Sequence, residues 1–302
     1  MKIGMVGLGR MGANMATRLM QGGHEVVGFD TNANTAAALE EKGAVAASSL
    51  ASLVRELQPP RAVWVMVPSG RITEETFAQL SRLLEAGDIV VDGGNSRYTD
   101  SIRRAASLGA LGMGFLDVGT SGGVWGLTEG YCLMVGGRKE DFHALLPIMT
   151  TLAPRDGYLH VGVAGAGHFT KMVHNGIEYA LMQAYGEGMQ LLAASDFDLD
   201  LAAIANVWRR GSVIRSWLLD LAAAALAKDS QLTQVADYVD DSGEGRWTIE
   251  TALAHAVPLP AIAASVFARF SSREQESMSA KVVAALRKEF GGHAVGREGR
   301  AA

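Results

Sequence analysis

Short apolar runs alternate with helical patterns over the first half of the chain. The apolar runs are nearly continuous, as in the strands of a parallel sheet that is covered on both faces. They are Lys2–Val6, Glu25–Phe29, Ala62–Val67, Ile89–Asp92, Gly114–Val118 and Cys132–Val135. The helical patterns between them include Asn14–Gln21, Ala36–Lys42 and Thr73–Leu84. This alternation predicts βαβ crossovers and therefore a doubly wound α/β domain.

The strand pattern ends near residue 166, and the second half of the chain has only helical patterns. The predicted helices are His168–Ser195, Leu199–Arg210, Val213–Ala227, Thr248–Ala256, Pro260–Phe270 and Arg273–Phe290. A loop-like polar segment covers residues 231–247, and residues 291–302 have the composition of a tail. We therefore predict an α/β domain over residues 1–165, an all-α C-terminal domain over 166–290 and a tail over 291–302.

Composition narrows the class of protein. The 302 residues suggest about two domains. Glycine accounts for 36 of them, or 36/302 ≈ 12%, against a usual ~7%. This excess needs local causes, such as tight turns and close backbone approach to a ligand. The net charge of −5 argues against a nucleic-acid partner, because such proteins present a basic surface.

The single cysteine, Cys132, cannot form an internal disulfide, which favours a reducing compartment. The N-terminus has no leader pattern. The apolar stretch Trp217–Ala227 is short and contains Asp220, whereas a membrane-spanning helix needs about 20 apolar residues. We therefore expect a cytoplasmic protein with no membrane partner.

A glycine motif follows the first predicted strand and opens a helix. Its residues are Gly7, Leu8, Gly9, Arg10, Met11 and Gly12. In a G-x-G-x-x-G loop the first glycine permits the turn, the second admits a pyrophosphate and the third lets helix and strand pack closely. Asp30 ends the second strand and suits ribose hydroxyls, so NAD is favoured over NADP. The neutral Thr31 and Asn32, with Arg10, leave NADP possible, and a glycine turn without a ligand is the alternative.

Three further segments follow predicted strand ends, where doubly wound sheets bind ligands. They are Val67-Pro68-Ser69-Gly70, Asp92-Gly93-Gly94-Asn95-Ser96 and Asp117-Val118-Gly119-Thr120-Ser121-Gly122-Gly123. The first is placed to contact a nicotinamide, and the other two offer amides and small polar groups to a carboxylate or polyol. Each segment could also be a plain turn, because glycine, proline and serine are turn residues.

A polar stripe runs along the predicted helix His168–Ser195. Lys171, His174, Asn175 and Glu178 share one face at spacings of three, four and seven residues. Lys171 and Glu178 are about 10 Å apart along the axis, so they could act on opposite ends of one small substrate. The alternative is a solvated stripe of an amphipathic helix.

Several segments together resemble the decarboxylating 6-phosphogluconate dehydrogenases, within the β-hydroxyacid dehydrogenase superfamily. They are Gly7–Gly12, DGGNS at Asp92–Ser96, DVGTSGGVWG at Asp117–Gly126, HFTKMVHNGIEY at His168–Tyr179, GEGRWT at Gly243–Thr248, FARFSS at Phe267–Ser272 and ALRKEFGGH at Ala285–His293. The first three are shared with the wider superfamily. The helical part is much shorter than in long members and resembles the short bacterial-type form. The resemblance implies a Rossmann-type domain followed by an all-α domain.

The resemblance implies a reaction: oxidative decarboxylation of 6-phospho-D-gluconate to D-ribulose 5-phosphate and CO₂, with hydride transfer to NAD or NADP. Lys171 resembles the family's general base for the C3 hydroxyl, and Glu178 resembles the acid that protonates C1. A β-keto carboxylate has its own electron sink, so no metal is required, and no cluster here has convincing metal-ligand spacing.

The resemblance also implies the binding residues. The cofactor would contact Gly7, Leu8, Gly9, Arg10, Met11, Gly12, Asp30, Val67, Pro68, Ser69 and Asn95. The sugar acid would contact Asn95, Ser121, Gly122, Gly123, His174 and Asn175, and its phosphate Tyr179, Arg269, Arg287 and His293. In the family the tail residues serve the neighbouring subunit, which implies a homodimer or homotetramer.

Two departures from the family pattern affect these expectations. Ser242 stands where long members carry a phosphate-binding lysine, and Asp30-Thr31 stands where NADP-using members carry Asn-Arg. The second departure favours NAD again. Two other functions remain open: a dehydrogenase for a smaller unphosphorylated hydroxy acid, and a dinucleotide sensor without catalysis.

Overall fold

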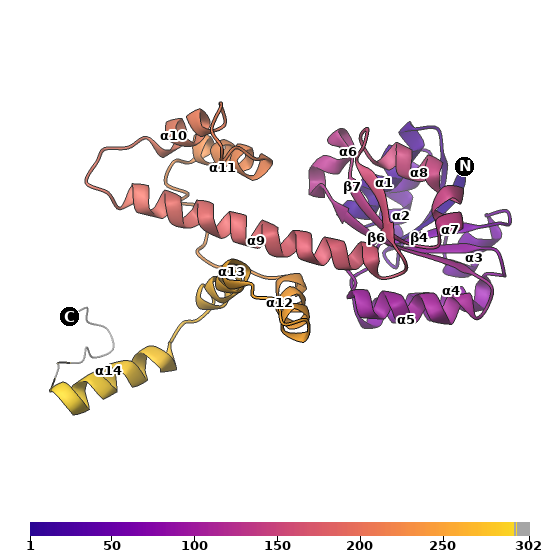
Figure 1. Ribbon diagram of the computed structural model, residues 1–302. Coiled ribbons are helices and arrows are strands. Elements are labelled where there is room, and N and C mark those ends of the chain that lie inside the picture. Colours follow the sequence, from indigo (N-terminus) through magenta and orange to yellow (C-terminus); the bar gives the residue numbers. More distant parts are fainter. Residues whose placement is uncertain (293, 295–302) are drawn as a thin grey trace. The chain divides into compact units, whose positions relative to one another are not determined.

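The computed structural model describes residues 1–292 and 294. The chain divides into two compact units, Met1–Gly176 and Ile177–Ala302 (Figure 1). The division falls within the long helix α9 (Ala166–Ala193). The two units therefore share one continuous element.

The first unit is built on an eight-stranded sheet with the order β3-β2-β1-β4-β5-β6-β7-β8. The strands are β1 (Lys2–Val6), β2 (Glu25–Phe29), β3 (Val45–Ala46), β4 (Ala62–Val65), β5 (Ile89–Asp92), β6 (Gly114–Ser121), β7 (Cys132–Gly137) and β8 (Tyr158–Gly162). Strands β1 to β6 pair in parallel. The strand order reverses between β1 and β4, which creates the crevice where such sheets bind ligands.

Two features of the sheet differ from the sequence prediction. β7 runs antiparallel to β6, because residues 122–131 between them are too few for a crossover helix. This connection contains only η1 (Gly123–Trp125) and α6 (Gly126–Glu129). The sheet also has two strands that were not predicted: β3 with only two residues, and β8, whose residues are mostly half-buried and of mixed polarity. The predicted class, a doubly wound α/β domain, is nevertheless confirmed.

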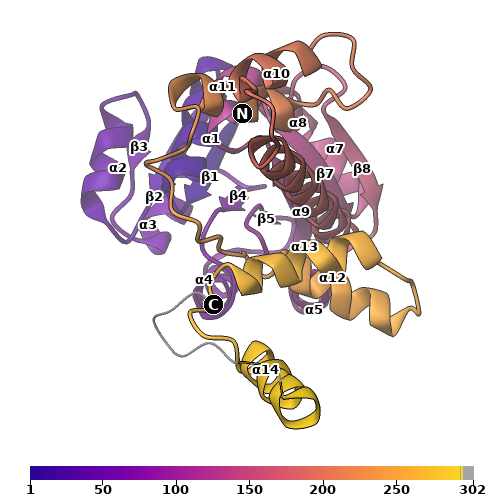
Figure 2. The ribbon, with the colours of Figure 1, turned by 90° about the vertical axis from the view of Figure 1, so that its left-hand side faces the viewer.

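Helices cover both faces of the sheet and create two separate hydrophobic cores (Figure 1, Figure 2). The helices are α1 (Arg10–Gln21), α2 (Ala33–Glu40), α3 (Leu50–Arg55), α4 (Arg71–Leu83), α5 (Tyr98–Gly109), α7 (Lys139–Ala144) and α8 (Leu146–Leu152). Leu19 of α1 and Ile148 of α8 belong to one core. Leu53 of α3, Phe77 of α4 and Leu108 of α5 belong to the other. Both faces are therefore buried, which explains the nearly continuous apolar runs of the strands.

The secondary structure of the second unit consists of helices in its described part. It contains the C-terminal part of α9 together with α10 (Leu201–Trp208), α11 (Trp217–Lys228), α12 (Glu244–Ala254), α13 (Pro260–Ser271) and α14 (Met278–Gly291). A small core joins Ala205, Leu219 and Ala223 to Tyr185 and Met189 of α9. None of the described helices is long and apolar enough to cross a membrane.

Three helices begin at other residues than the sequence predicted, because capping residues set their starts. Ser216 and Ser277 accept hydrogen bonds from the third amide of α11 and α14, so these helices begin later than predicted. α12 begins earlier, at Glu244, because Gly243 adopts a left-handed conformation that ends the preceding loop. The apolar pattern identified each helix, and the capping residue set its start.

Candidate active site

The glycine loop between β1 and α1 has the geometry of a phosphate cradle. Gly7 has a φ of +88°, and a Cβ on Gly12 would lie 2.0 Å from the Gly7 carbonyl oxygen, so both positions require glycine. A Cβ on Gly9 would meet nothing within 4 Å. The loop is thus closely packed beneath and open above Gly9, at the N-terminus of α1, where free amides favour an anion.

Asp30 joins this loop to the end of β2. Its Oδ2 accepts a hydrogen bond of 2.7 Å from the amide of Leu8, and its Oδ1 accepts one of 2.8 Å from the amide of Asn32. The carboxylate is therefore held beside the glycine loop by two backbone groups. Each carboxylate oxygen has a second lone pair, so Asp30 can still accept from ribose hydroxyls.

The segments after β4 and β5 lie against each other. A Cβ on Gly94 would lie 2.9 Å from the Val67 carbonyl oxygen, so only glycine allows this close contact. Thr73 donates to the Pro68 carbonyl at 2.8 Å and ties the first segment to α4. Ser69 and Asn95 are exposed. The structure therefore brings the predicted Val67–Ser69 and Asn95 segments together.

A buried ion network supports the segment that carries Asn95. Asp92 is 1% exposed and accepts a 2.6 Å hydrogen bond from Nη1 of Arg104. Nη2 of Arg104 donates to Glu74 of α4, also at 2.6 Å. Hydrogen bonds from Arg103 and then from Arg104 hold the pKa of Glu74 below its ordinary value. This network connects α4 and α5 to the end of β5.

The segment after β6 lies beneath the start of α9. A Cβ on Gly119 would lie 2.4 Å from Cβ of Lys171, so the strand backbone touches the base of the lysine side chain. Ser121 is half-buried, and Gly122 and Gly123 adopt positive φ values of +132° and +53°. The structure thus connects the predicted Ser121–Gly123 segment to Lys171 through β6.

Three predicted side chains form a cluster on one turn of α9. Lys171 and Asn175 are each 6% exposed. Nζ of Lys171 donates to Oδ1 of Asn175, which also lies 3.0 Å from Nδ1 of His174. A buried lysine held by an amide oxygen differs from the surface charge of a solvated stripe.

Tyr179 and Arg269 meet in the second unit. The Arg269 guanidinium lies 3.6 Å from the Tyr179 ring centroid and donates to the Asp240 carbonyl at 3.2 Å. The Tyr179 hydroxyl lies 3.1 Å from Oγ of Ser242, and Ser242 donates to Glu244 at 2.7 Å. Nε of Arg269 is buried without a hydrogen-bond partner among the described residues. Ser242 therefore occupies a polar cluster with the two predicted phosphate ligands.

Three predicted residues remain: Glu178, Arg287 and His293. Glu178 is half-buried on α9. Arg287 is exposed on α14, and no hydrogen bond, ion pair or ring contact links it to Tyr179 or Arg269 in the part of the chain that the structure describes. His293 lies outside the described residues.

Sequence reasoning missed the residues that hold these segments, among them Asp117, Arg104 and Asp241. Asp241 accepts hydrogen bonds from the Gly243 amide, Arg246 and Arg273. Burial opposes ionisation of Asp241, but the bonds from Arg273 and Gly243 and the charge of Arg246 hold its pKa below the ordinary value. The sequence Asp-Asp-Ser-Gly at residues 240–243 could have indicated the role of Asp241, because it is typical of a turn in which a side chain bonds to the backbone.

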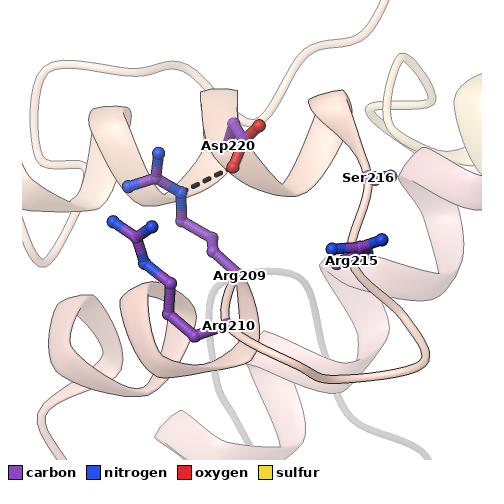
Figure 3. A pocket seen from close by; sticks show the side chains of 5 residues that line it. All are labelled: Arg209, Arg210, Arg215, Ser216 and Asp220. Carbon is purple, nitrogen blue, oxygen red and sulfur yellow. Dashed lines mark hydrogen bonds and ion pairs between the residues drawn. The ribbon is translucent and has the colours of Figure 1, made fainter.

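The second unit also has a cavity of about 400 Å³ that none of the predicted residues lines (Figure 3). Its lining consists of Arg209, Arg210, Arg215, Ser216 and Asp220. Arg209 donates to Asp220 at 2.6 Å. Three cations face one carboxylate there, so the recess is electropositive.

A doubly wound sheet with a glycine loop at its switch point, joined to a helix with a buried lysine, defines a dinucleotide-dependent oxidoreductase. Comparison with known families narrows this class. The family model described as the NAD binding domain of 6-phosphogluconate dehydrogenase matches residues 2–173. The model described as the 6-phosphogluconate dehydrogenase C-terminal domain matches residues 167–298.

Individual relatives agree with these matches. A Haloferax volcanii protein named 6-phosphogluconate dehydrogenase, NAD(+)-dependent, decarboxylating, is 45% identical over 99% of both chains. A Bacillus subtilis protein of the same name is 36% identical over 94% of this chain, which covers 64% of that protein. The structure of Plasmodium falciparum 6-phosphogluconate dehydrogenase superposes with a TM-score of 0.83 at 26% identity, over 96% of this chain and 65% of that one.

The chain belongs to the 6-phosphogluconate dehydrogenase family. The resemblance, the fold class and the dinucleotide cofactor that the sequence predicted are confirmed. The chain spans about two thirds of the longer relatives and almost the full length of the Haloferax protein, in agreement with the short form.

Proposed function

We propose that the protein oxidises and decarboxylates 6-phospho-D-gluconate to D-ribulose 5-phosphate and CO₂, with NAD as the preferred acceptor. The observation that carries this proposal is the cluster of Lys171, His174 and Asn175 on α9, with Lys171 seated directly on Gly119. A buried amine held by Asn175 beside β6 suits a catalytic group better than a solvated surface charge.

The cofactor site fits a dinucleotide in its shape and its chemistry. The open space above Gly9, the amides at the start of α1 and the oriented carboxylate of Asp30 suit a pyrophosphate and a ribose. NAD would supply the acceptor for the hydride that leaves C3 of the substrate. The negative charge of Asp30 repels a 2′-phosphate and favours NAD, while the neutral Thr31 and Asn32 leave NADP possible.

Lys171 would act on C3 of the substrate. Its neutral amine accepts the proton of the C3 hydroxyl as C3 is oxidised to a ketone. The resulting β-keto acid loses its carboxylate as CO₂, and the electron pair of the broken bond moves to the C3 oxygen. Lys171, now an ammonium, returns a proton to that oxygen. Asn175 holds Nζ in place during both transfers, because its Oδ1 accepts from the amine.

Glu178 would complete the reaction by protonating C1 of the enediol. It follows Lys171 by two helical turns, about 10 Å, so a sugar acid can lie between the two groups. Asn95, Ser121, Gly122, Gly123, His174 and Asn175 would bind its hydroxyls and carboxylate. Tyr179 and Arg269 would bind the phosphate, since the guanidinium is already oriented over the phenol ring.

The helix α14 supports an oligomer. None of its described residues is buried, yet Met278, Val282, Leu286 and Phe290 repeat every four positions and are 48–79% exposed. A helix with an apolar stripe is stable when that stripe is covered. We propose a homodimer or homotetramer in which α14 packs on a neighbouring copy and brings Arg287 and His293 to that copy's phosphate.

A spectrophotometric assay tests the function. Purified protein is given 6-phosphogluconate or unphosphorylated gluconate with NAD or NADP, and the reduced cofactor and CO₂ are both measured. We expect turnover with 6-phosphogluconate and NAD, with one CO₂ for each NADH. Equal rates with gluconate would favour a dehydrogenase for a smaller hydroxy acid. NAD binding without turnover of any hydroxy acid would favour a sensor.

A further inference from the structure

Asp117 near the middle of β6 is a fully buried carboxylate that the proposed reaction does not use. Its Oδ1 accepts a hydrogen bond of 2.7 Å from the Gly165 amide, and its Oδ2 accepts one of 2.8 Å from the His168 amide. Gly165 immediately precedes α9, and His168 is its third residue. In a capping box, side chains of the same helix end accept hydrogen bonds from these two amides. Here the acceptor is Asp117, on a strand 48 residues before Gly165.

Around this cap, glycines allow β6, β7 and the start of α9 to approach one another closely. A Cβ on Gly136 of β7 would lie 2.5 Å from Oδ1 of Asp117, and a Cβ on Gly167 would lie 2.3 Å from the Asp117 carbonyl oxygen. Gly119 brings β6 equally close to the base of Lys171. Apart from the Asp117 carboxylate and the base of Lys171, the first turn of α9 therefore rests directly on sheet backbone. Such a contact leaves little freedom for the helix to rotate or slide.

A second bond restrains the same turn from the side. Oγ of Ser101 in α5 lies 2.7 Å from Nδ1 of His168, and both side chains are buried. The rings of Tyr98 and Phe169 make an edge contact at 5.3 Å. The strand, the neighbouring helix and the glycine contact thus converge on the turn that immediately precedes Lys171.

We infer that Asp117 is the positioning residue for Lys171. Its carboxylate sets the height and rotation of α9 on the sheet and thereby places Nζ of Lys171 relative to the Ser121–Gly123 segment. The charge suits this role, because a carboxylate at a helix N-terminus interacts favourably with the helix dipole and with free amides. The inference rests on the proposed function only in taking Lys171 as the base.

The test compares Asp117→Asn with a matched control, Asp88→Asn. Asp88 is 1% exposed and accepts from the amides of Arg61 and Glu85 and also from the Arg61 guanidinium at 3.0 Å. It lies just before β5, at the opposite edge of the sheet from the glycine loop. An asparagine at 117 can accept from only one of the two amides. We expect kcat to fall about 10- to 100-fold, as misplacement of a catalytic group by an ångström can cause. KM for NAD should change less than about twofold.

Two readouts separate positioning from loss of stability. The deuterium isotope effect on kcat with 3-deuterated substrate should rise in Asp117→Asn, because the chemical step becomes slower, and should stay unchanged in Asp88→Asn. Hydrogen exchange at the Gly165 and His168 amides should accelerate only in Asp117→Asn. Unchanged kcat and isotope effect in a folded Asp117→Asn protein would overturn the inference, as would equal losses in the two variants.

If Asp117→Asn does not fold, Ser101→Ala replaces it as the test variant. This substitution removes only the hydrogen bond between Ser101 and His168 and therefore loosens the same turn of α9. A lower kcat with unchanged KM for NAD then supports the inference, and wild-type kcat overturns it. An inactive wild-type enzyme would instead overturn the proposed function. In that case the exchange of the two amides would still test whether Asp117 caps α9.

Discussion

At the scale of single residues, the chemistry depends on polar groups whose partners are backbone atoms. Asp30 accepts from two amides at the ends of β1 and β2, and Asp117 accepts from two amides at the start of α9. The first carboxylate could be predicted, because its distance from the glycine motif is characteristic. The second could not, because its partners lie 48 and 51 residues away and nothing local in the sequence marks the pairing.

Lys171→Met should abolish oxidation of 6-phosphogluconate. Methionine fills the buried space of the lysine stem but cannot accept the C3 proton. NAD binding should be unchanged, because the glycine loop and Asp30, which are proposed to hold the pyrophosphate and ribose, remain intact, and calorimetry measures it directly. Weaker NAD binding together with lost activity would indicate a structural role for Lys171.

Asp30→Ala should relax discrimination against NADP, because it removes the charge that repels a 2′-phosphate. It also removes acceptors from the Leu8 and Asn32 amides, so Asp30→Asn is the matched variant that preserves shape without charge. The ratio of kcat/KM for NAD to that for NADP should fall in both variants by about tenfold or more, equivalent to roughly 1.4 kcal/mol. An unchanged ratio would refute the role of charge.

Asp241 predicts a pH dependence of stability. Its folded-state pKa is lowered, so its ionised form stabilises the fold above its ordinary pKa of about 4. This contribution is lost as the pH falls through the folded-state value. Asp241→Asn should lower the free energy of unfolding at pH 7 by about 1–3 kcal/mol, and the difference from wild type should shrink below about pH 4. Urea unfolding measures both, with exposed Asp237→Asn as the unaffected control.

At the scale of elements, the long helix α9 could be predicted from the sequence, but its contact with strand β6 could not. The helical period and the polar stripe identified α9 within two residues at each end. The close contact with β6 depends on which strand segment lies beneath the helix, and this follows only from the sheet order. The antiparallel β7 was missed for a similar reason, because its direction depends on the short connection through η1 and α6.

Gly119→Ala tests the close contact between β6 and α9. The new methyl would lie 2.4 Å from Cβ of Lys171, so the helix must shift. We expect kcat to fall about tenfold or more and the free energy of unfolding to fall by about 1–3 kcal/mol. Gly186→Ala on the same helix is the control, since its Cβ meets nothing within 4 Å and should stabilise the protein by up to about 1 kcal/mol. Wild-type kcat in Gly119→Ala would contradict the tight contact.

At the scale of the whole molecule, α14 exposes both an apolar stripe and Arg287. Tyr179 and Arg269 lie together, while Arg287 is exposed on α14. If Arg287 serves a neighbouring copy, the apolar stripe of α14 and its arginine have a common explanation. The sequence resemblance predicts this exchange, and it stays a prediction.

Subunit mixing tests the exchange. Lys171→Met and Arg287→Ala chains should each be nearly inactive at low substrate concentration. When they are unfolded, mixed and refolded, hybrid dimers should contain one site with both native residues, provided that Arg287 acts on the neighbour. Activity should then recover to about one quarter of wild type, as random pairing in a two-fold dimer predicts. No recovery would mean that Arg287 serves its own chain.

The continuity of α9 has a consequence for the length of substrate that the enzyme can accept. Lys171 belongs to the first unit and Glu178 to the second, yet one unbroken helix of 28 residues carries both. The geometry of that helix sets the spacing of the two side chains along its axis. If both act on one substrate as proposed, a shorter or longer sugar acid would bring only one of its ends to the correct group.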